Sequence, residues 1–151
     1  MYKRILVPTD GSQLAGQAVA AAIDYARASG AVVVAFSVAQ PYPILPAVDG
    51  AMMIDPGIDS KELQQIAQQS VDEVARAAKD GGVACETHTA MSFLPYEEII
   101  RAAEEYRCDV IFIASHGRRG LSRLLAGSQT QKVLAYSRVP VLVLRPELPA
   151  A

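Results

Sequence analysis

Four continuous apolar runs, rich in β-branched residues, constrain the fold of this chain more than any other feature. They occupy residues 5–7, 31–36, 110–113 and 139–144, and a weaker fifth run spans 83–88. A strand that is apolar without alternation is buried on both faces, which is typical of a parallel sheet covered by helices. The four strong runs are therefore predicted to be strands with two buried faces.

Helical periodicity fills the gaps between these runs. The first predicted helix ends at Gly30, the second ends at the Gly81-Gly82 pair, the third has Pro95 in its first turn, and the fourth follows Gly127. The residues expected on the inner helix faces are Ala15, Val19, Ala22, Ile23 and Ala26, then Leu63, Ile66, Ala67, Ser70, Val71, Val74 and Ala78, then Ile99, Ile100 and Ala103, and finally Val133 and Leu134.

This alternation of strands and helices predicts a three-layer α/β fold. Right-handed crossovers give a doubly wound, five-stranded parallel sheet, with the strand order 3-2-1-4-5. The length of 151 residues suits a single domain over residues 1–151.

Composition narrows the functional classes. The net charge of −2 supplies no global basic field for nucleic acid. No run approaches the roughly 18 apolar residues of a membrane span, and the apolar run that ends at Pro8 is too short for a signal peptide. Cys85 and Cys108 form no CxxC pair, which favours two reduced thiols. These features predict a cytoplasmic protein without nucleic-acid or membrane partners.

Ligands of doubly wound sheets bind beyond the carboxyl ends of the strands. Pro8, Thr9 and Asp10 follow the first predicted strand, and Val38 follows the second. Asp10 has two interpretations, because an aspartate before Gly-Ser can contact a ligand or form a turn or helix cap. The position of the loop favours ligand contact.

The stretch "ASHGRRGLSRLLAGSQT", residues 114–130, has the composition of a phosphate site. Glycines allow close backbone approach, and Gly127-Ser128 is predicted just before a helix, where unpaired N–H groups attract anions. Arg118, Arg119 and Arg123 add positive charge, whereas His116 could bind phosphate or only fill the loop. The stretch matches neither the Walker P-loop nor the GxGxxG fingerprint.

The glycine spacing resembles the nucleotide-binding motif of the universal stress protein family, Gly-x2-Gly-x9-Gly-Ser/Thr. Gly117, nine further residues and Gly127-Ser128 match its second part, and Ala114 stands in place of its first glycine. The segments "KRILVPTDGS", "PYEEIIRAAEEYRCDVIFIASHGRRG" and "VPVLVLRP" also resemble the family. The resemblance covers essentially the whole chain.

The resemblance to ATP-binding universal stress proteins implies a Rossmann-like, adenine nucleotide alpha hydrolase-like fold. It implies that ATP, or AMP or ADP, binds with Mg or Mn held through the phosphates, and that a homodimer forms through the last strand, Val139 to Arg145. Asp10 would face the ribose or adenine, Val38 would offer backbone groups to the adenine, and Gly117 would hold phosphates. The nucleotide-binding residues expected on this basis are Pro8, Thr9, Asp10, Val38, Ala114, His116, Gly117, Arg118, Gly127, Ser128 and Gln129.

The expected function is therefore a small cytoplasmic nucleotide-binding protein of the stress response. We identify no catalytic residue and no carboxylate or His/Cys spacing for a protein-only metal site. Two alternatives stay open: a slow ATPase that acts by positioning alone, and an interaction module without nucleotide, for which the Ala114 replacement argues.

Overall fold

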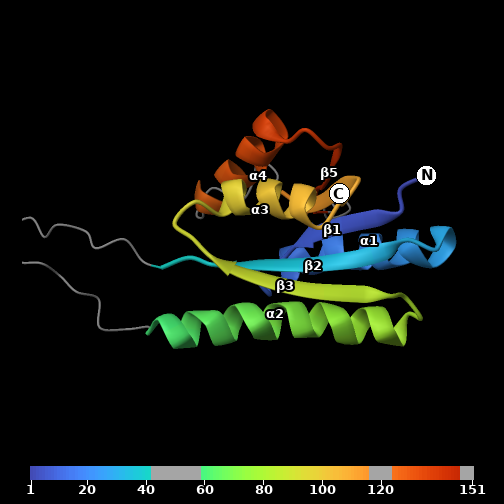
Figure 1. Ribbon diagram of the computed structural model, residues 1–151, viewed down its shortest axis with the longest axis horizontal. Helices are drawn as coiled ribbons and strands as arrows, with labels where there is room; N and C mark the ends of the chain where they lie inside the picture. The colour runs from blue at the N-terminus through green and yellow to red at the C-terminus, as the bar shows by residue number, and fades with distance from the viewer. Residues whose placement is uncertain (42–58, 116–123, 147–151) are drawn as a thin grey trace, which may run out of the picture.

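The computed structural model describes residues 1–41, 59–115 and 124–146 of the chain, with no account of the side chains of 124–127. Its elements in chain order are β1 (Arg4–Pro8), α1 (Gln13–Ser29), β2 (Val32–Ala39), α2 (Ser60–Asp80), β3 (Cys85–Met91), α3 (Pro95–Glu105), β4 (Val110–Ala114), α4 (Leu124–Tyr136) and β5 (Val141–Leu144). All strands form one parallel sheet of order β3-β2-β1-β4-β5, which confirms the predicted topology (Figure 1).

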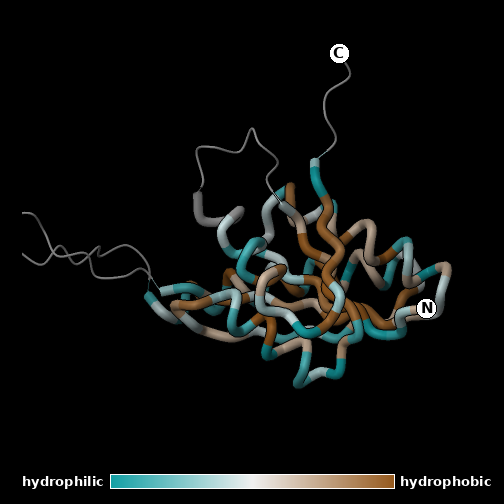
Figure 2. The backbone as a smooth tube through the Cα atoms, turned by 90° about the horizontal axis from the view of Figure 1, so that it is seen from above, coloured by the Kyte–Doolittle hydropathy of each residue, from teal (hydrophilic) through white to brown (hydrophobic). Residues whose placement is uncertain are grey.

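The sheet separates two apolar cores. One core packs α1 and α2 against one face, and the other packs α3 and α4 against the opposite face. The central strands belong to both cores because their side chains alternate between the faces. Figure 2 shows the hydrophobic segments of the chain gathered at the centre of the molecule. None of the helices in the described ranges is long and apolar enough to cross a membrane.

Most of the helix ends lie at the residues from which they were predicted. Gly30 ends α1 at a φ of 74°, a left-handed conformation that costs glycine little. Ser12 caps the other end of α1, where its hydroxyl accepts a hydrogen bond from Ala15 N. Pro95 opens α3, and Gly81 follows α2 as its C-cap. These signals act within one turn of the chain, which is why sequence alone reveals them.

Three predictions about burial are wrong. Ile66 and Leu134 were placed on inner helix faces, but they are 44% and 49% exposed. The buried stripe of α2 runs through Ala67, Val71 and Val74, so Ile66 lies at its margin. β5 was predicted to have two buried faces, yet Leu142 is 44% exposed because β5 is an edge strand that the helices cover only in part.

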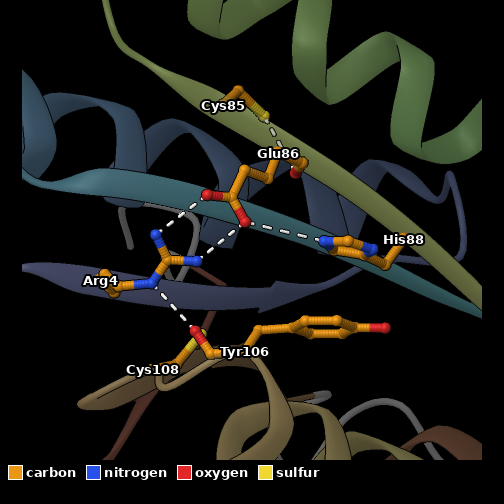
Figure 3. A network of polar contacts seen from close by, with 6 residues as sticks. All are labelled: Arg4, Cys85, Glu86, His88, Tyr106 and Cys108. Carbon is orange, nitrogen blue, oxygen red and sulfur yellow. Dashed lines mark hydrogen bonds and ion pairs between the residues drawn. The ribbon is translucent and has the colours of Figure 1, made fainter.

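A polar network ties the amino ends of β1 and β3 together across β2 (Figure 3). The Arg4 guanidinium donates to both oxygens of Glu86 at 2.9 and 2.8 Å, and its Nε donates to Tyr106 O at 2.9 Å. The hydrogen bonds from Arg4 lower the pKa of Glu86. His88 stacks on the Tyr106 ring at 3.8 Å between centroids, and its Nε2 lies 3.7 Å from Glu86 Oε2.

The chain start is fastened to β4 by one carboxylate. Asp109, next to β4, accepts hydrogen bonds from Lys3 N at 2.9 Å and Arg4 N at 3.0 Å. Its own N–H donates to Arg4 O at 3.0 Å. These bonds hold β1 in register against β4 at the amino edge of the sheet.

The cysteines are both free thiols. Burial raises the pKa of Cys108 to about 11, and it also raises the pKa of the half-buried Cys85 thiol. Neither thiol is therefore a reactive thiolate near neutral pH.

The Arg4–Glu86 pair should make stability depend on pH. At pH 7 we expect Glu86→Gln to lower the free energy of unfolding by about 0.2–1 kcal/mol, the range for exposed ion pairs. Because the folded-state pKa of Glu86 is lowered, this contribution is present above its ordinary pKa of 4.5 and is lost as the pH falls further. Urea unfolding at pH 7 and pH 3 tests this, with Glu73→Gln on the exposed side of α2 as the control. A difference that persists at pH 3 would contradict it.

Candidate functional site

The hydrogen-bonded ladder between β1 and β4 ends before the carboxyl edge of the sheet, in part because Pro8 has no N–H to donate, and we call the edge beyond this ladder the opening. β1 pairs with β2 along its whole length, from Arg4↔Val32 to Pro8↔Phe36. Its pairing with β4 covers only Ile5↔Val110 and Leu6↔Ile111, although both strands are fully described. The strand order reverses at this position, which is where doubly wound proteins bind their ligands. The carboxyl ends of β1 and β4, beyond this short ladder, therefore form the candidate site.

The loop after β1 is a sequence of tight turns at the rim of this opening. Thr9 is buried, donates its N–H to Phe36 O at 2.8 Å, and accepts Gly11 N at its hydroxyl at 3.1 Å. Asp10 is exposed, and its Oδ1 accepts Ser12 N at 2.9 Å. Asp10 thus forms the turn, as its structural interpretation predicted, while Ser12 caps α1. The Oδ2 atom of Asp10 has no partner among the described residues and remains available to a ligand.

The end of β2 turns backbone groups towards the same opening. Phe36 O faces β1, because it accepts Thr9 N. Successive residues of a strand direct their backbone groups to opposite neighbours, so Val38 also faces the β1 side. β1 ends at Pro8, opposite Phe36, so no β1 residue lies opposite Val38. The Val38 N–H and C=O are therefore positioned to bind an edge of a planar ligand.

The fourth helix begins earlier than predicted. α4 starts at Leu124, so Gly127 and Ser128 are its fourth and fifth residues rather than residues that precede it. The reason is that Leu124, Leu125 and Ala126 favour the helix, whose first turn tolerates a glycine. The first turn of α4 carries no acidic residue, and its positive dipole end therefore attracts anions without competition from a carboxylate.

The side chains that follow Ser128 have partners within the protein. Gln129 Oε1 accepts Tyr96 N at 2.9 Å, so this predicted nucleotide-binding residue caps α3. Thr130 donates its hydroxyl to Ala114 O at 3.0 Å and is 3% exposed. Thr130 is not among the site residues predicted from the sequence. The sequence feature that could have indicated it is its spacing: Thr130 is a hydroxyl residue three positions before the core residue Val133, and so lies on the buried face of the helix.

The remaining predicted residues divide into two groups. Pro8 and Ala114 are half-buried at the ends of β1 and β4, on either side of the opening. His116, Gly117 and Arg118 lie outside the described residues, as do Arg119 and Arg123. The structure therefore brings the β1, β2 and β4 residues and the start of α4 to one edge of the sheet.

Comparison with known proteins agrees with this geometry. A family model described as "Universal stress protein family" matches residues 1–145. Universal stress protein MJ0531 of Methanocaldococcus jannaschii is 34% identical over 148 residues, which are 96% of this chain and 83% of the relative.

Two solved structures resemble the whole chain. The structure of MJ0577, from the same archaeon, has a TM-score of 0.77 at 28% identity and covers 99% of both chains. The universal stress protein from Archaeoglobus fulgidus in complex with dAMP has a TM-score of 0.67 at 19% identity, over 94% of this chain and 97% of that chain. The second likeness concerns the fold alone.

The turn that presents Asp10 depends on Gly11. Its φ is +78°, and a Cβ there would lie 2.9 Å from Ser70 Oγ. We expect Gly11→Ala to lower the free energy of unfolding by about 1–3 kcal/mol, because the left-handed strain and the close contact add up. Gly16→Ala is the matched control: its Cβ meets no atom within 4 Å, and in a helix it should stabilise by about 1 kcal/mol. Denaturant unfolding of both variants measures this, and equal effects would refute the strain at Gly11.

Proposed function

The chain belongs to the universal stress protein family, and we propose that it binds an adenine nucleotide at the carboxyl edge of its sheet. The ligand is ATP, or its products ADP and AMP. The observation that carries the proposal is the early end of the β1–β4 ladder at the carboxyl edge of the sheet, the edge at which the Val38 backbone and the exposed Asp10 carboxylate also lie. The dAMP complex of the A. fulgidus protein, on the same fold, supports it.

Each part of the nucleotide has a matching group in this proposal. The adenine lies beside Val38, whose N–H and C=O can read its edge, and Pro8 and Thr9 form the neighbouring wall. Asp10 accepts hydrogen bonds from the ribose through its second oxygen.

The phosphates occupy the start of α4 in this proposal. The helix dipole and the hydroxyl of Ser128 favour an anion there, and the glycine motif assigns Gly117 and Gly127 to the same contact. His116 and Arg118 are proposed phosphate contacts on the motif alone. Mg or Mn is held through the phosphates, since within the described ranges no group of three or more His, Cys, Asp or Glu could hold a metal.

The proposed role is regulatory binding in the cytoplasm, with any hydrolysis of ATP slow. Positioning of the triphosphate by backbone groups and a helix terminus can accelerate hydrolysis only modestly without a base. The free thiols of Cys85 and Cys108 suit a reducing compartment.

Gly127→Val tests the phosphate assignment. A branched side chain in the first turn of α4 should obstruct the phosphates, so we expect ATP affinity to fall by at least about tenfold, or about 1.4 kcal/mol. Isothermal titration after removal of copurified ligand measures this, with Gly16→Ala as the control that keeps full affinity. If the parent binds no adenine nucleotide, the nucleotide-free alternative replaces this proposal. If the parent binds ATP and Gly127→Val binds it with the same affinity, the phosphates lie elsewhere.

We further propose a homodimer through the last strand, Val139 to Arg145. The two edges of the sheet differ in kind: β3 carries Glu86 and His88 in a polar network, whereas β5 is apolar with an exposed Leu142. Charged side chains on an edge strand disfavour pairing with a second chain, whereas an apolar edge strand favours it.

The backbone of β5 supports the same assembly. Ile111 N donates to Pro140 O and Ser115 N donates to Leu144 O, so alternate residues of β5 face β4. Val141 and Val143 consequently direct their N–H and C=O groups away from the sheet. A second copy related by a two-fold axis would pair with these groups and close the assembly.

Leu142→Lys should separate the two subunits. Leu142 is exposed in the single chain, so a lysine there should change the stability of the monomer little. In a dimer interface the lysine ammonium would lose its hydration, which destabilises the dimer. We expect light scattering to give a dimer mass for the parent and a monomer mass for the variant. Ile66→Lys on α2 is the matched control, at the same 44% exposure, and should remain dimeric. A monomeric parent at micromolar concentration would refute the interface.

A further inference from the structure

The early end of the β1–β4 ladder leaves a backbone carbonyl of β4 without a partner in the sheet. Ile111 N and Ser115 N donate to β5, so the odd-numbered residues of β4 face β5. Ala114 therefore directs its carbonyl to the β1 side, where pairing has already ended at Leu6↔Ile111. A carbonyl in this position needs another partner, because an unpaired buried backbone group is costly.

Thr130 supplies that partner from α4. Its hydroxyl donates to Ala114 O at 3.0 Å, and the residue is 3% exposed. A threonine inside a helix ordinarily directs its hydroxyl to a carbonyl of the preceding turn, so a bond to another element is a specific attachment. It joins the helix to β4 at the residue that stands in the first glycine position of the motif.

Gln129 makes a second attachment next to the first. The N-cap of α3 is Leu94, which makes no side-chain cap, and Pro95 has no N–H. Tyr96 N is consequently the first donor of α3 that needs a partner, and Gln129 Oε1 accepts it at 2.9 Å. Two consecutive residues thus fasten α4 to β4 and to α3, directly after Ser128.

We propose that Thr130 and Gln129 are positioning residues for the phosphates. They set the place of the first turn of α4 relative to the end of β4, and they do so without contact with the nucleotide. Val133, which packs in the apolar core, lies about one turn further along α4, so the hydrogen bonds at residues 129 and 130 act closer to the start of the helix. The inference rests on the proposed nucleotide site.

Thr130→Val tests it, because valine keeps the shape and removes the hydroxyl. We expect calorimetric titration to show ATP affinity at least about tenfold weaker and adenosine affinity within about twofold of the parent, since only the phosphates meet the start of α4. Thr130→Ser should restore ATP binding. Ser70→Ala is the control: it removes another buried hydroxyl, bonded within α2 at 2.9 Å, and should change neither affinity.

A second readout needs no nucleotide. If the hydroxyl holds the end of β4, Thr130→Val should speed amide hydrogen exchange at Ser115, whose N–H is bonded to Leu144 O, in the ligand-free protein. Should Thr130→Val not fold, Gln129→Met removes the neighbouring attachment of α4 to α3 and should show the same selective loss of ATP affinity.

The outcomes separate this inference from the proposed function. Unchanged ATP affinity, an equal loss of ATP and adenosine affinity, or unchanged exchange at Ser115 would overturn the positioning role while the nucleotide site stands. A parent protein that binds neither ATP nor adenosine would overturn both.

Discussion

The position of β1 at the centre of the sheet determines the rest of this structure. Ile5, Leu6 and Val7 are fully buried, with β2 on one side and β4 on the other. Helices must cover both faces of such a strand, and crossovers of one hand then carry the chain outward in two directions. The strand order reverses at β1. β1 and β4 are therefore neighbours in the sheet that no single crossover connects. The ladder between them ends early, and every proposed ligand contact lies at the carboxyl edge beyond it.

Much of the fold could be predicted from the sequence because its signals are local. The β-branched runs mark strands, Gly30 and Pro95 mark helix boundaries, and the alternation implies the strand order. Local sequence patterns do not predict burial where burial depends on the packing of another element. Ile66 and Leu142 have the composition of core residues, but burial depends on which helices reach them, and the helices cover the sheet edges and the ends of α2 only in part.

The candidate site divides in the same way. Thr9 and Asp10 could be predicted at the carboxyl edge because they follow a strand, whereas Val38, which was predicted to follow the second strand, is the next-to-last residue of β2. All three lie near this edge, and their contact with a ligand stays a prediction. The attachments of Gln129 and Thr130 could not be assigned, because each depends on a backbone group of another element that the sequence does not reveal. Tyr96 N needs a partner because a leucine and a proline precede it, and Ala114 O needs one because the β1–β4 ladder ends before it.

The bonds between Asp109 and the chain start have a consequence for biosynthesis. Asp109 meets Arg4 across 105 residues of sequence, so the central strand is made first and receives its second neighbour late. At ribosomal rates of roughly 5–20 residues per second, about 5–20 s pass between the two. Throughout that interval Ile5, Leu6 and Val7 can pair with β2 alone, and the face that α3 and α4 will cover stays open. The nascent chain therefore carries an apolar half-sheet that invites chaperone binding until β4 has left the ribosome.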